Sequence, residues 1–484
     1  MRSLHALCAL AAVLPAGCMV GPEYKPPEPL PGAPPDKPFE TAVSTTAGFV
    51  PGPVTPDWWN TLGDPKLTDL VRRSVADSLD LKTADSRVRE ARAARGLAAA
   101  DLGPQVSFGS AAGPGAPGPG VAGNYAVRTE NWKAFGFDAS WEIDVFGGNR
   151  RAVQAAGAEA EAAMEARRDV LVSLLGEVGR NYVELRGAQR RLEIARRNIE
   201  IAAKTLDFVR TRRETGLGTE LEVRQAGGQL ESVRATLPPL EAAVRKAIFR
   251  LGVLQAKEPA GLLGELSEPA PIPEAPPEIP TGLPSELLRR RPDVRRAERE
   301  LAAATARLGA AVADKFPRFA LTGNVTLGGF YVGPAVKWPV FDSGRIASNI
   351  AVSDERLEQA TLRYRAVVLT ALEDVENALT AYAQEQIRRG NLANAVAEAR
   401  RAVALAEQQH KDGLRDFLVV LDAQRTFYAL QDQLVLSEQS LLVNLVSLYK
   451  ALGGGWDQFA GPADKPLPSP LLPPPLVPTP PARP

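Results

Sequence analysis

The stretch Phe135–Val145, with the sequence FGFDASWEIDV, alternates between two kinds of residue without a break. Its odd positions are apolar, and its even positions are glycine, serine or a carboxylate. A period of two held over this length is typical of a tilted strand that crosses a bilayer with one face to lipid and the other to water. The stretch therefore predicts an amphipathic membrane strand.

A short glycine join connects this strand to a very long predicted helix. Residues 146–148 (FGG) are followed by a run rich in Ala, Glu and Arg that contains no proline before Pro238. The portion 147–215 would form a helix about 100 Å long. The same join recurs at 340–345 (VFDSGR), and a second proline-free helical run extends to about Asp412. Two helices of this length do not fit an ordinary compact domain.

The second half of the chain repeats the first. Asp80 and Asp293 are 213 residues apart, as are Pro104 and Pro317; Phe146 and Phe341 are 195 apart, as are Arg150 and Arg345; Gly216 and Gly413 are 197 apart. The 18-residue change indicates a shorter hairpin loop in the second half. Each half therefore reads as helix, hairpin, long helix, turn and helix, which predicts a duplicated protomer with four strands.

These patterns divide the chain into a leader, a strap, two repeats and a tail. We expect a signal peptide at 1–17, an extended strap at 18–56, an equatorial segment between the repeats at 256–283 and a Pro-rich tail at 457–484. The first repeat, 57–255, contains a hairpin at 105–146, a long helix at 147–215 and a return helix at 219–255 that is interrupted at Pro238 and Pro239. The second repeat, 284–456, contains a hairpin at 317–341, a long helix at 344–412 and a return helix at 416–452.

The N-terminal residues predict export and lipidation. Arg2 provides a positive charge, Leu4 to Leu14 form the apolar core, and the small-residue site PAGC ends at Cys18. Cleavage before a cysteine is the pattern of a bacterial lipoprotein, so we expect acylation of Cys18. The alternative is ordinary cleavage with Cys18 as a free thiol. By analogy with lipoprotein sorting rules, Met19 favours the outer membrane.

Composition excludes several classes of protein. The chain has 57 basic and 57 acidic side chains, so the charge excess of a nucleic-acid-binding protein is missing. The arginines of 289–296 are interpreted as a solvated helix face. Both cysteines precede residue 19, and His410 is the one histidine after the leader, so we expect no metal site and no cofactor. No catalytic or nucleotide-binding motif is found, which predicts that the protein is not an enzyme and that a partner supplies the energy.

Four strands per chain require several chains to close a barrel, because unpaired backbone groups are costly in lipid. Two chains would give eight strands with a filled interior, and three would give twelve with a wider lumen. The polar face, with Asp138, Glu142 and Asp144, favours water inside and therefore three or more chains. The long helices leave the same end of each hairpin, so they should project into the periplasm as a tube.

Several motifs resemble a known family. They are CMVGPEYKP at 18–26, RRPDV at 290–294, VFDSG at 340–344, LDAQR at 421–425 and YKALGGGW at 449–456. Together they resemble the outer-membrane efflux protein family (TolC-like), and most closely its lipoprotein branch that serves resistance-nodulation-division pumps. The resemblance implies a mainly α-helical homotrimer with a shared twelve-stranded transmembrane β-barrel and an α-helical tunnel. It also implies contact with outer-membrane lipid, a periplasmic adaptor (membrane fusion) protein and an inner-membrane pump.

The same resemblance implies a gate at the periplasmic tip. Asp422 matches a ring-forming gate aspartate, Leu418 matches an apolar constriction, and Val419 falls where the family has a second acidic residue. Arg415 matches a latch arginine whose partner would be Glu222 on a neighbouring coiled coil, and His410 stands where the family often has tyrosine. The turn residues would contact the adaptor; they are Gly216, Leu217, Gly218, Gly413 and Leu414.

Two alternatives to an efflux duct stay open at this point. One is a structural coiled-coil lipoprotein of the envelope, which would explain the helices and the lipid but not two hairpins of membrane length. The other is the outer-membrane exit duct of a type I protein secretion system. The lumen residues select by size and charge, so the sequence does not define the exported molecule.

Overall fold

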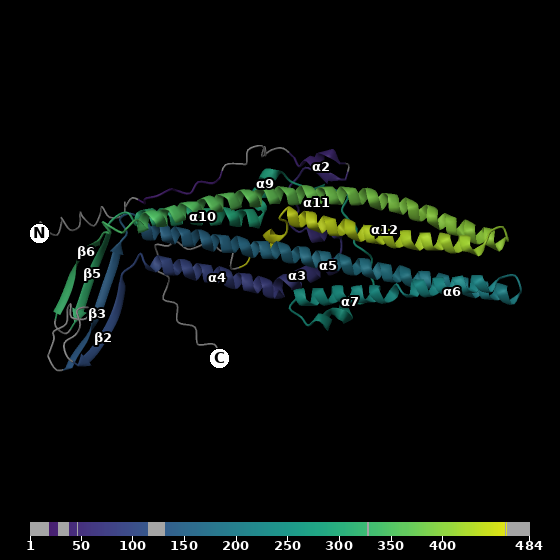
Figure 1. The fold of residues 1–484 in the computed structure, drawn as a ribbon, viewed down its shortest axis with the longest axis horizontal. Helices are drawn as coiled ribbons and strands as arrows, with labels where there is room; N and C mark the ends of the chain where they lie inside the picture. The colour runs from purple at the N-terminus through teal and green to yellow at the C-terminus, as the bar shows by residue number, and fades with distance from the viewer. Residues whose placement is uncertain are drawn as a thin grey trace.

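The protein is an elongated molecule in which a four-stranded sheet lies at one end of a bundle of long helices (Figure 1). This computed structural model describes residues 19–27, 38–45, 47–114, 131–326, 329–459 and 461. The signal peptide and Cys18 lie outside the described residues, as does nearly all of the tail after Phe459. The helices run from the sheet to the far end and turn back there, which gives two helical hairpins (Figure 1).

Four antiparallel strands form the sheet in the order β2-β3-β5-β6. They are β2 (Gln105–Pro114), β3 (Asn131–Ile143), β5 (Arg318–Thr326) and β6 (Gly329–Lys337). The middle pair joins the two repeats, with Ser140 of β3 opposite Thr322 of β5. The prediction of four strands per chain is confirmed, although β3 ends at Ile143 and not at Val145.

The faces of the sheet differ in polarity, as the alternation predicts. On one face, the rings of Phe108 and Phe137 lie 5.3 Å apart and are 61% and 54% exposed. On the other face, the side-chain amide of Asn324 donates a hydrogen bond of 2.7 Å to Asp138. One face therefore presents aromatic side chains to the surroundings, while the other carries polar groups.

The two long helices are equal in length. They are α5 (Gly148–Glu214) and α11 (Arg345–Lys411), with 67 residues each. Each is preceded by a glycine in the left-handed conformation, Gly147 with φ +80° and Gly344 with φ +81°. Glycine adopts this conformation without the steric cost that a Cβ brings, so it permits the sharp turn from strand to helix.

The residues at which α5 and α11 begin correct one predicted equivalence between the repeats. Gly147 and Gly344 are 197 residues apart, the same separation as the turn glycines at the far end. Arg345 is therefore equivalent to Gly148, and its predicted equivalence with Arg150 is wrong. The reason is local: two additional residues, Asp342 and Ser343, stand between the phenylalanine and the capping glycine of the second join.

Shorter helices lead into each hairpin and return from each tip. Those that lead in are α3 (Pro65–Asp77) and α4 (Leu79–Ala100) in the first repeat, and α9 (Pro284–Arg290) and α10 (Pro292–Ala313) in the second. Those that return are α6 (Glu220–Arg234), α7 (Leu237–Leu254) and α12 (Phe417–Ala451). Among the described residues, no helix combines the length and the apolar character needed to cross a bilayer.

The return path is broken in the first repeat and continuous in the second. Helix α6 ends at Arg234, and α7 starts at Leu237 with its prolines in the first turn, where a missing backbone N–H is tolerated. The interruption predicted at Pro238 is therefore found a few residues earlier. Helix α12 runs through the equivalent region as one helix of 35 residues.

An equatorial band surrounds the middle of the helices (Figure 1). Its elements are α2 (Glu40–Ser44), β1 (Phe49–Val50), η2 (Trp58–Leu62), η3 (Pro259–Leu262), α8 (Leu263–Leu266), β4 (Ile279–Pro280) and η4 (Trp456–Phe459). Strands β1 and β4 pair in parallel and so tie the strap to the segment between the repeats.

The largest hydrophobic core lies beneath this band. Trp58 is 1% exposed and stacks on Tyr449, with ring centroids 5.5 Å apart. A Cβ on Gly179 would lie 2.6 Å from the Trp58 ring, so the glycine lets the indole approach α5. Trp58 and Trp59 are packing residues, as expected, whereas Trp456 is partly exposed beneath the guanidinium of Arg168.

Candidate functional site

The far ends of the two helical hairpins form equivalent tips. Gly216 has φ +79° and Gly413 has φ +74°, and each follows the end of a long helix. The N–H of Leu217 donates to the carbonyl of Arg212 at 2.8 Å, and Leu414 makes the same bond to Gln409. This pattern is a Schellman helix end, which satisfies carbonyls that the helix leaves unpaired.

Each tip presents a leucine to solvent. Leu217 is 70% exposed and Leu414 is 72% exposed, at equivalent places in the two turns. A Cβ on Gly218 would lie 3.1 Å from the carboxylate of Glu222, so this turn leaves little room for a side chain. The turns combine exposed apolar groups with a defined backbone, and their contact with an adaptor stays a prediction.

The proposed latch residues have different surroundings. Glu222 completes a capping box, since its carboxylate accepts from the Thr219 N–H at 2.8 Å while its own N–H donates to the Thr219 hydroxyl at 3.3 Å. Arg415 is exposed in the other tip. Within the described part of this single chain, no ion pair joins Glu222 and Arg415. The latch was expected between neighbouring coiled coils, and it stays a prediction.

His410 connects the two tips. It is 6% exposed, with Nε2 3.1 Å from a guanidinium nitrogen of Arg212 and Nδ1 3.1 Å from the carbonyl oxygen of Arg415. A guanidinium only donates, so Nε2 accepts and Nδ1 carries the proton that it donates to Arg415. His410 thus joins the end of α5 to the turn after α11, a role that the sequence did not reveal.

The proposed gate residues lie on the outward face of α12. Leu418 is 52% exposed, and Asp422 is exposed one turn later on the same face. Phe417, Val420 and Leu421 are buried against the other helices of the tip. The chain's own packing therefore uses the inner face of α12 and leaves Leu418 and Asp422 available to other chains.

A second cluster lies where the sheet meets the helices. The Val20 N–H donates to the Phe146 carbonyl at 3.1 Å, and the buried Arg151 donates to the carbonyls of Val20 and Gly21 at 3.2 and 3.4 Å. A Cβ on Gly21 would lie 2.5 Å from the Cα of Gly309, so only glycine allows this approach. Met19, Val20 and Gly21, which directly follow Cys18 in the sequence, thus lie at this junction.

Tyr24 fixes the next part of the strap to α10. Its hydroxyl donates to Glu298 at 2.8 Å, and the guanidinium of Arg299 lies 5.4 Å from its ring centroid. Burial and the Glu298 carboxylate raise the pKa of Tyr24 above its ordinary value. Nothing in the sequence pattern distinguished Arg151 or Arg299 from the other arginines, because their roles depend on which helix faces meet the strap.

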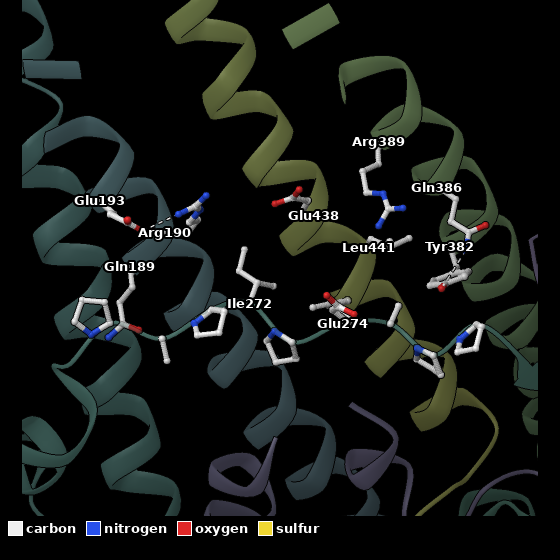
Figure 2. A pocket seen from close by; sticks show the side chains of 18 residues that line it. Gln189, Arg190, Glu193, Ile272, Glu274, Tyr382, Gln386, Arg389, Glu438 and Leu441 are labelled. Atoms are coloured by element: carbon white, nitrogen blue, oxygen red, sulfur yellow. Dashed lines mark hydrogen bonds and ion pairs between the residues drawn. The ribbon is translucent and has the colours of Figure 1, made fainter. Parts of the chain in front are cut away.

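The equatorial band covers a hollow of about 870 Å³. Figure 2 shows Glu438 of α12 between Arg190 of α5 and Arg389 of α11, with Ile272 and Glu274 on the segment that crosses below them. Burial raises the pKa of Glu438, and the two arginines oppose this effect. The lining mixes charges of both signs and contains no histidine, cysteine or serine.

Comparisons with known proteins place these features in a family. The model of the family described as "Outer membrane efflux protein" matches residues 70–254 and 283–454. Nodulation protein T of Rhizobium leguminosarum bv. viciae is 30% identical over 475 residues, which is 95% of each chain. The pyoverdine export outer membrane protein OpmQ of Pseudomonas aeruginosa is 33% identical over 82% of this chain and 87% of its own.

A solved structure shows the same fold. The outer-membrane channel OprN matches with a TM-score of 0.83 and 34% identity, over 91% of this chain and all of that chain. Its likeness therefore includes both the sheet and the long helices. From the family match over most of its length, and from these relatives, the chain belongs to the outer membrane efflux protein family.

Proposed function

We propose that three copies of this chain form a gated duct that carries small molecules out through the outer membrane. The observation that carries the proposal is the open sheet on long helices that all leave it on one side (Figure 1). Both edge strands, β2 and β6, have one unpaired side within the chain, and an open edge is costly in lipid. Pairing β6 of one copy with β2 of the next satisfies both edges.

Three copies give twelve strands, and the helices below them form a continuous tunnel. Because the polar side chains share one face of the sheet, closure places Asp138 and Asn324 inside and the paired phenylalanines against lipid. This arrangement supports an aqueous pore. Leu418 and Asp422 would then form an apolar and an acidic ring at the periplasmic end, which together hinder the passage of polar solutes.

The N-terminal contacts support the proposed lipid anchor. Met19, Val20 and Gly21 lie at the junction of sheet and helices, which is the inner surface of the membrane if the sheet spans it. An acyl chain on Cys18 would enter the bilayer beside the barrel. Changing Cys18→Ser should remove the lipid mass and leave the trimer intact, and an unchanged mass would exclude acylation.

The relatives suggest the class of cargo and the partners. One is named for export of pyoverdine and another for efflux of toluene, which differ strongly in polarity. We infer that the duct accepts small molecules delivered by an inner-membrane pump through a periplasmic adaptor. The exposed leucines at both tips provide apolar points of contact for that adaptor.

The proposal is tested by the mass and conductance of the detergent-extracted protein. The wild type should have the mass of three chains and conduct weakly in a planar bilayer. Leu418→Ala with Asp422→Ala should raise the single-channel conductance. The matched control changes Leu221→Ala and Gln225→Ala, the positions 197 residues earlier in the first repeat.

Three outcomes decide the matter. Opening by the second-repeat pair alone supports the assigned gate. An equal response to both pairs removes the gate from Leu418 and Asp422 but keeps the duct. A monomer that never conducts contradicts the duct itself.

A further inference from the structure

A cationic hollow without an assigned role lies in the half of the helical bundle that is nearer the sheet. Helices α4, α5, α10 and α11 lie side by side there as one layer (Figure 1). A hollow of about 780 Å³ is lined by side chains from all four of these helices. All four helices therefore contribute side chains to the same face of this layer.

The strap supports this orientation. Tyr24 contacts Glu298 and Arg299 on α10. The hollow is lined instead by the stripe Arg296, Glu300, Ala303 and Arg307, whose spacing of three and four residues follows one face of the helix. At about 100° per residue, Glu298 lies on the opposite side of α10 from this stripe, and Arg299 lies at its edge. The strap therefore covers one face of this layer, and the hollow lies on the opposite face.

Arginines dominate the charge of the hollow. Two of its five arginines are paired, Arg296 with Glu300 at 2.9 Å and Arg307 with Glu159. The other three are exposed, and no carboxylate of the described residues pairs with them; they are Arg87, Arg356 and Arg363. Burial and the neighbouring Arg356 lower the pKa of Arg307, so these two cations lie close enough to repel each other.

This charge is local. The adjoining hollow nearer the sheet has more carboxylates than arginines: Glu142, Asp144, Glu159 and Asp314 against Arg307 and Arg318. The far end of the bundle presents Asp422. The bundle is therefore acidic near the sheet, basic at this hollow, and carries an exposed aspartate at its far end.

We propose that the hollow is a binding site for small organic anions on the wall of the duct. A guanidinium attracts an oxyanion and forms charge-assisted hydrogen bonds to it, and three unpaired guanidiniums in one hollow favour a solute with several acidic groups. The proposal rests on the proposed function, because the face opposite the strap becomes the wall of a lumen only when three copies close into a tube. Three copies form a cationic belt that attracts anionic cargo after it passes the acidic tip.

The test measures binding of pyranine, a small trisulfonate dye, to the full-length detergent-solubilised protein by fluorescence anisotropy at low salt. The variant R87Q/R356Q/R363Q should bind roughly tenfold more weakly, because three charge-assisted contacts are lost. The control R89Q/R365Q removes two exposed arginines that do not line the hollow and should bind as the wild type does. The variant R87K/R356K/R363K keeps the charges and should retain most of the binding.

The outcomes separate the belt from the duct. The belt is excluded if the wild type does not bind the dye, or if the triple glutamine variant and the control bind equally well. The triple lysine variant keeps the three positive charges and so controls for misfolding. If it still has the mass of a trimer but no longer binds the dye, the site does not depend on charge and the proposal is contradicted. Conductance of the same wild-type preparation tests the duct independently: a conducting wild type with an unaffected triple variant refutes the belt alone.

Discussion

Replacing Arg291 with alanine should weaken the contacts among the helices of the second repeat by a predictable amount. Arg291 lies between α9 and α10, is 8% exposed, and holds Asp293 with two hydrogen bonds of 3.0 and 2.6 Å. It also donates to Asp374 on α11 at 2.9 Å, and to the carbonyls of Ala371 and Ala451 at 3.3 and 3.1 Å. One side chain therefore connects α10, α11 and the end of α12.

The exposure of the two partner carboxylates determines how much stability the substitution removes. Removing one member of a buried ion pair costs about 3–5 kcal/mol, chiefly because the remaining charge is stranded. The side chains of Asp293 and Asp374 are 32% and 47% exposed, so water can solvate both after the change. The two carbonyls lose a buried donor, and we therefore expect Arg291→Ala to cost about 3 kcal/mol, the lower end of the range.

A double-mutant cycle provides the assay. Arg291→Ala, Asp374→Ala and the double variant are unfolded with denaturant in detergent, and helix loss is followed by circular dichroism. We expect a coupling energy of about 1–2 kcal/mol between the two side chains. The control Arg401→Gln removes an arginine whose ion pair with Glu398 is 74% and 71% exposed, and should cost under about 1 kcal/mol. Additive effects, or an Arg291→Ala cost equal to that of the control, would refute the reasoning.

Three further predictions concern the core, the equator and the tip. Trp58→Ala should cost about 3–5 kcal/mol and lower the unfolding temperature, because the indole is fully buried; an unchanged temperature would contradict its core role. Arg73 lowers the pKa of Glu265 to about 2, so this carboxylate stabilises the fold above about pH 4.5, and the benefit is lost as the pH falls towards 2. The stability gap between wild type and Glu265→Gln should therefore be about 2 kcal/mol at pH 7, allowing for partial exposure, and should close in acid; a gap independent of pH would exclude this cause. Thr219→Ala should cost about 0.5–2 kcal/mol by removing the cap of α6, and faster hydrogen exchange confined to the first-repeat tip would show it.

Local patterns were enough to predict the overall architecture. The alternation around Trp141 predicted β3 because a membrane strand needs a period of two, and the glycines before each long helix marked its start. The absence of proline from both runs predicted the length of the two helices. The one misplaced equivalence, Arg150 with Arg345, arose because two residues inserted in a turn shift the start of a helix without changing the motif around it.

Contacts between distant segments were not readable from the sequence. His410 was recognised by position, but its role depends on Arg212, which lies 198 residues away and reaches it only after both helices have turned. Arg151 looked like any other arginine of its helix until the strap was seen against it. The cationic hollow is a further case, because its arginines come from separate helices and gather on one face only when four helices pack in order.

The two tips have the same backbone conformation but differ in the side chains that they present. Leu418 and Asp422 have Leu221 and Gln225 as their counterparts in the first repeat, so only one of the two equivalent positions is charged. In the proposed trimer, the first-repeat and second-repeat tips alternate around the axis, three of each. One substitution in the sequence therefore changes three of these six tips and leaves the other three as they were. Because the repeat is duplicated, the side chains of one set of tips can change to suit closure of the gate, while the other set keeps its fit to a docking partner.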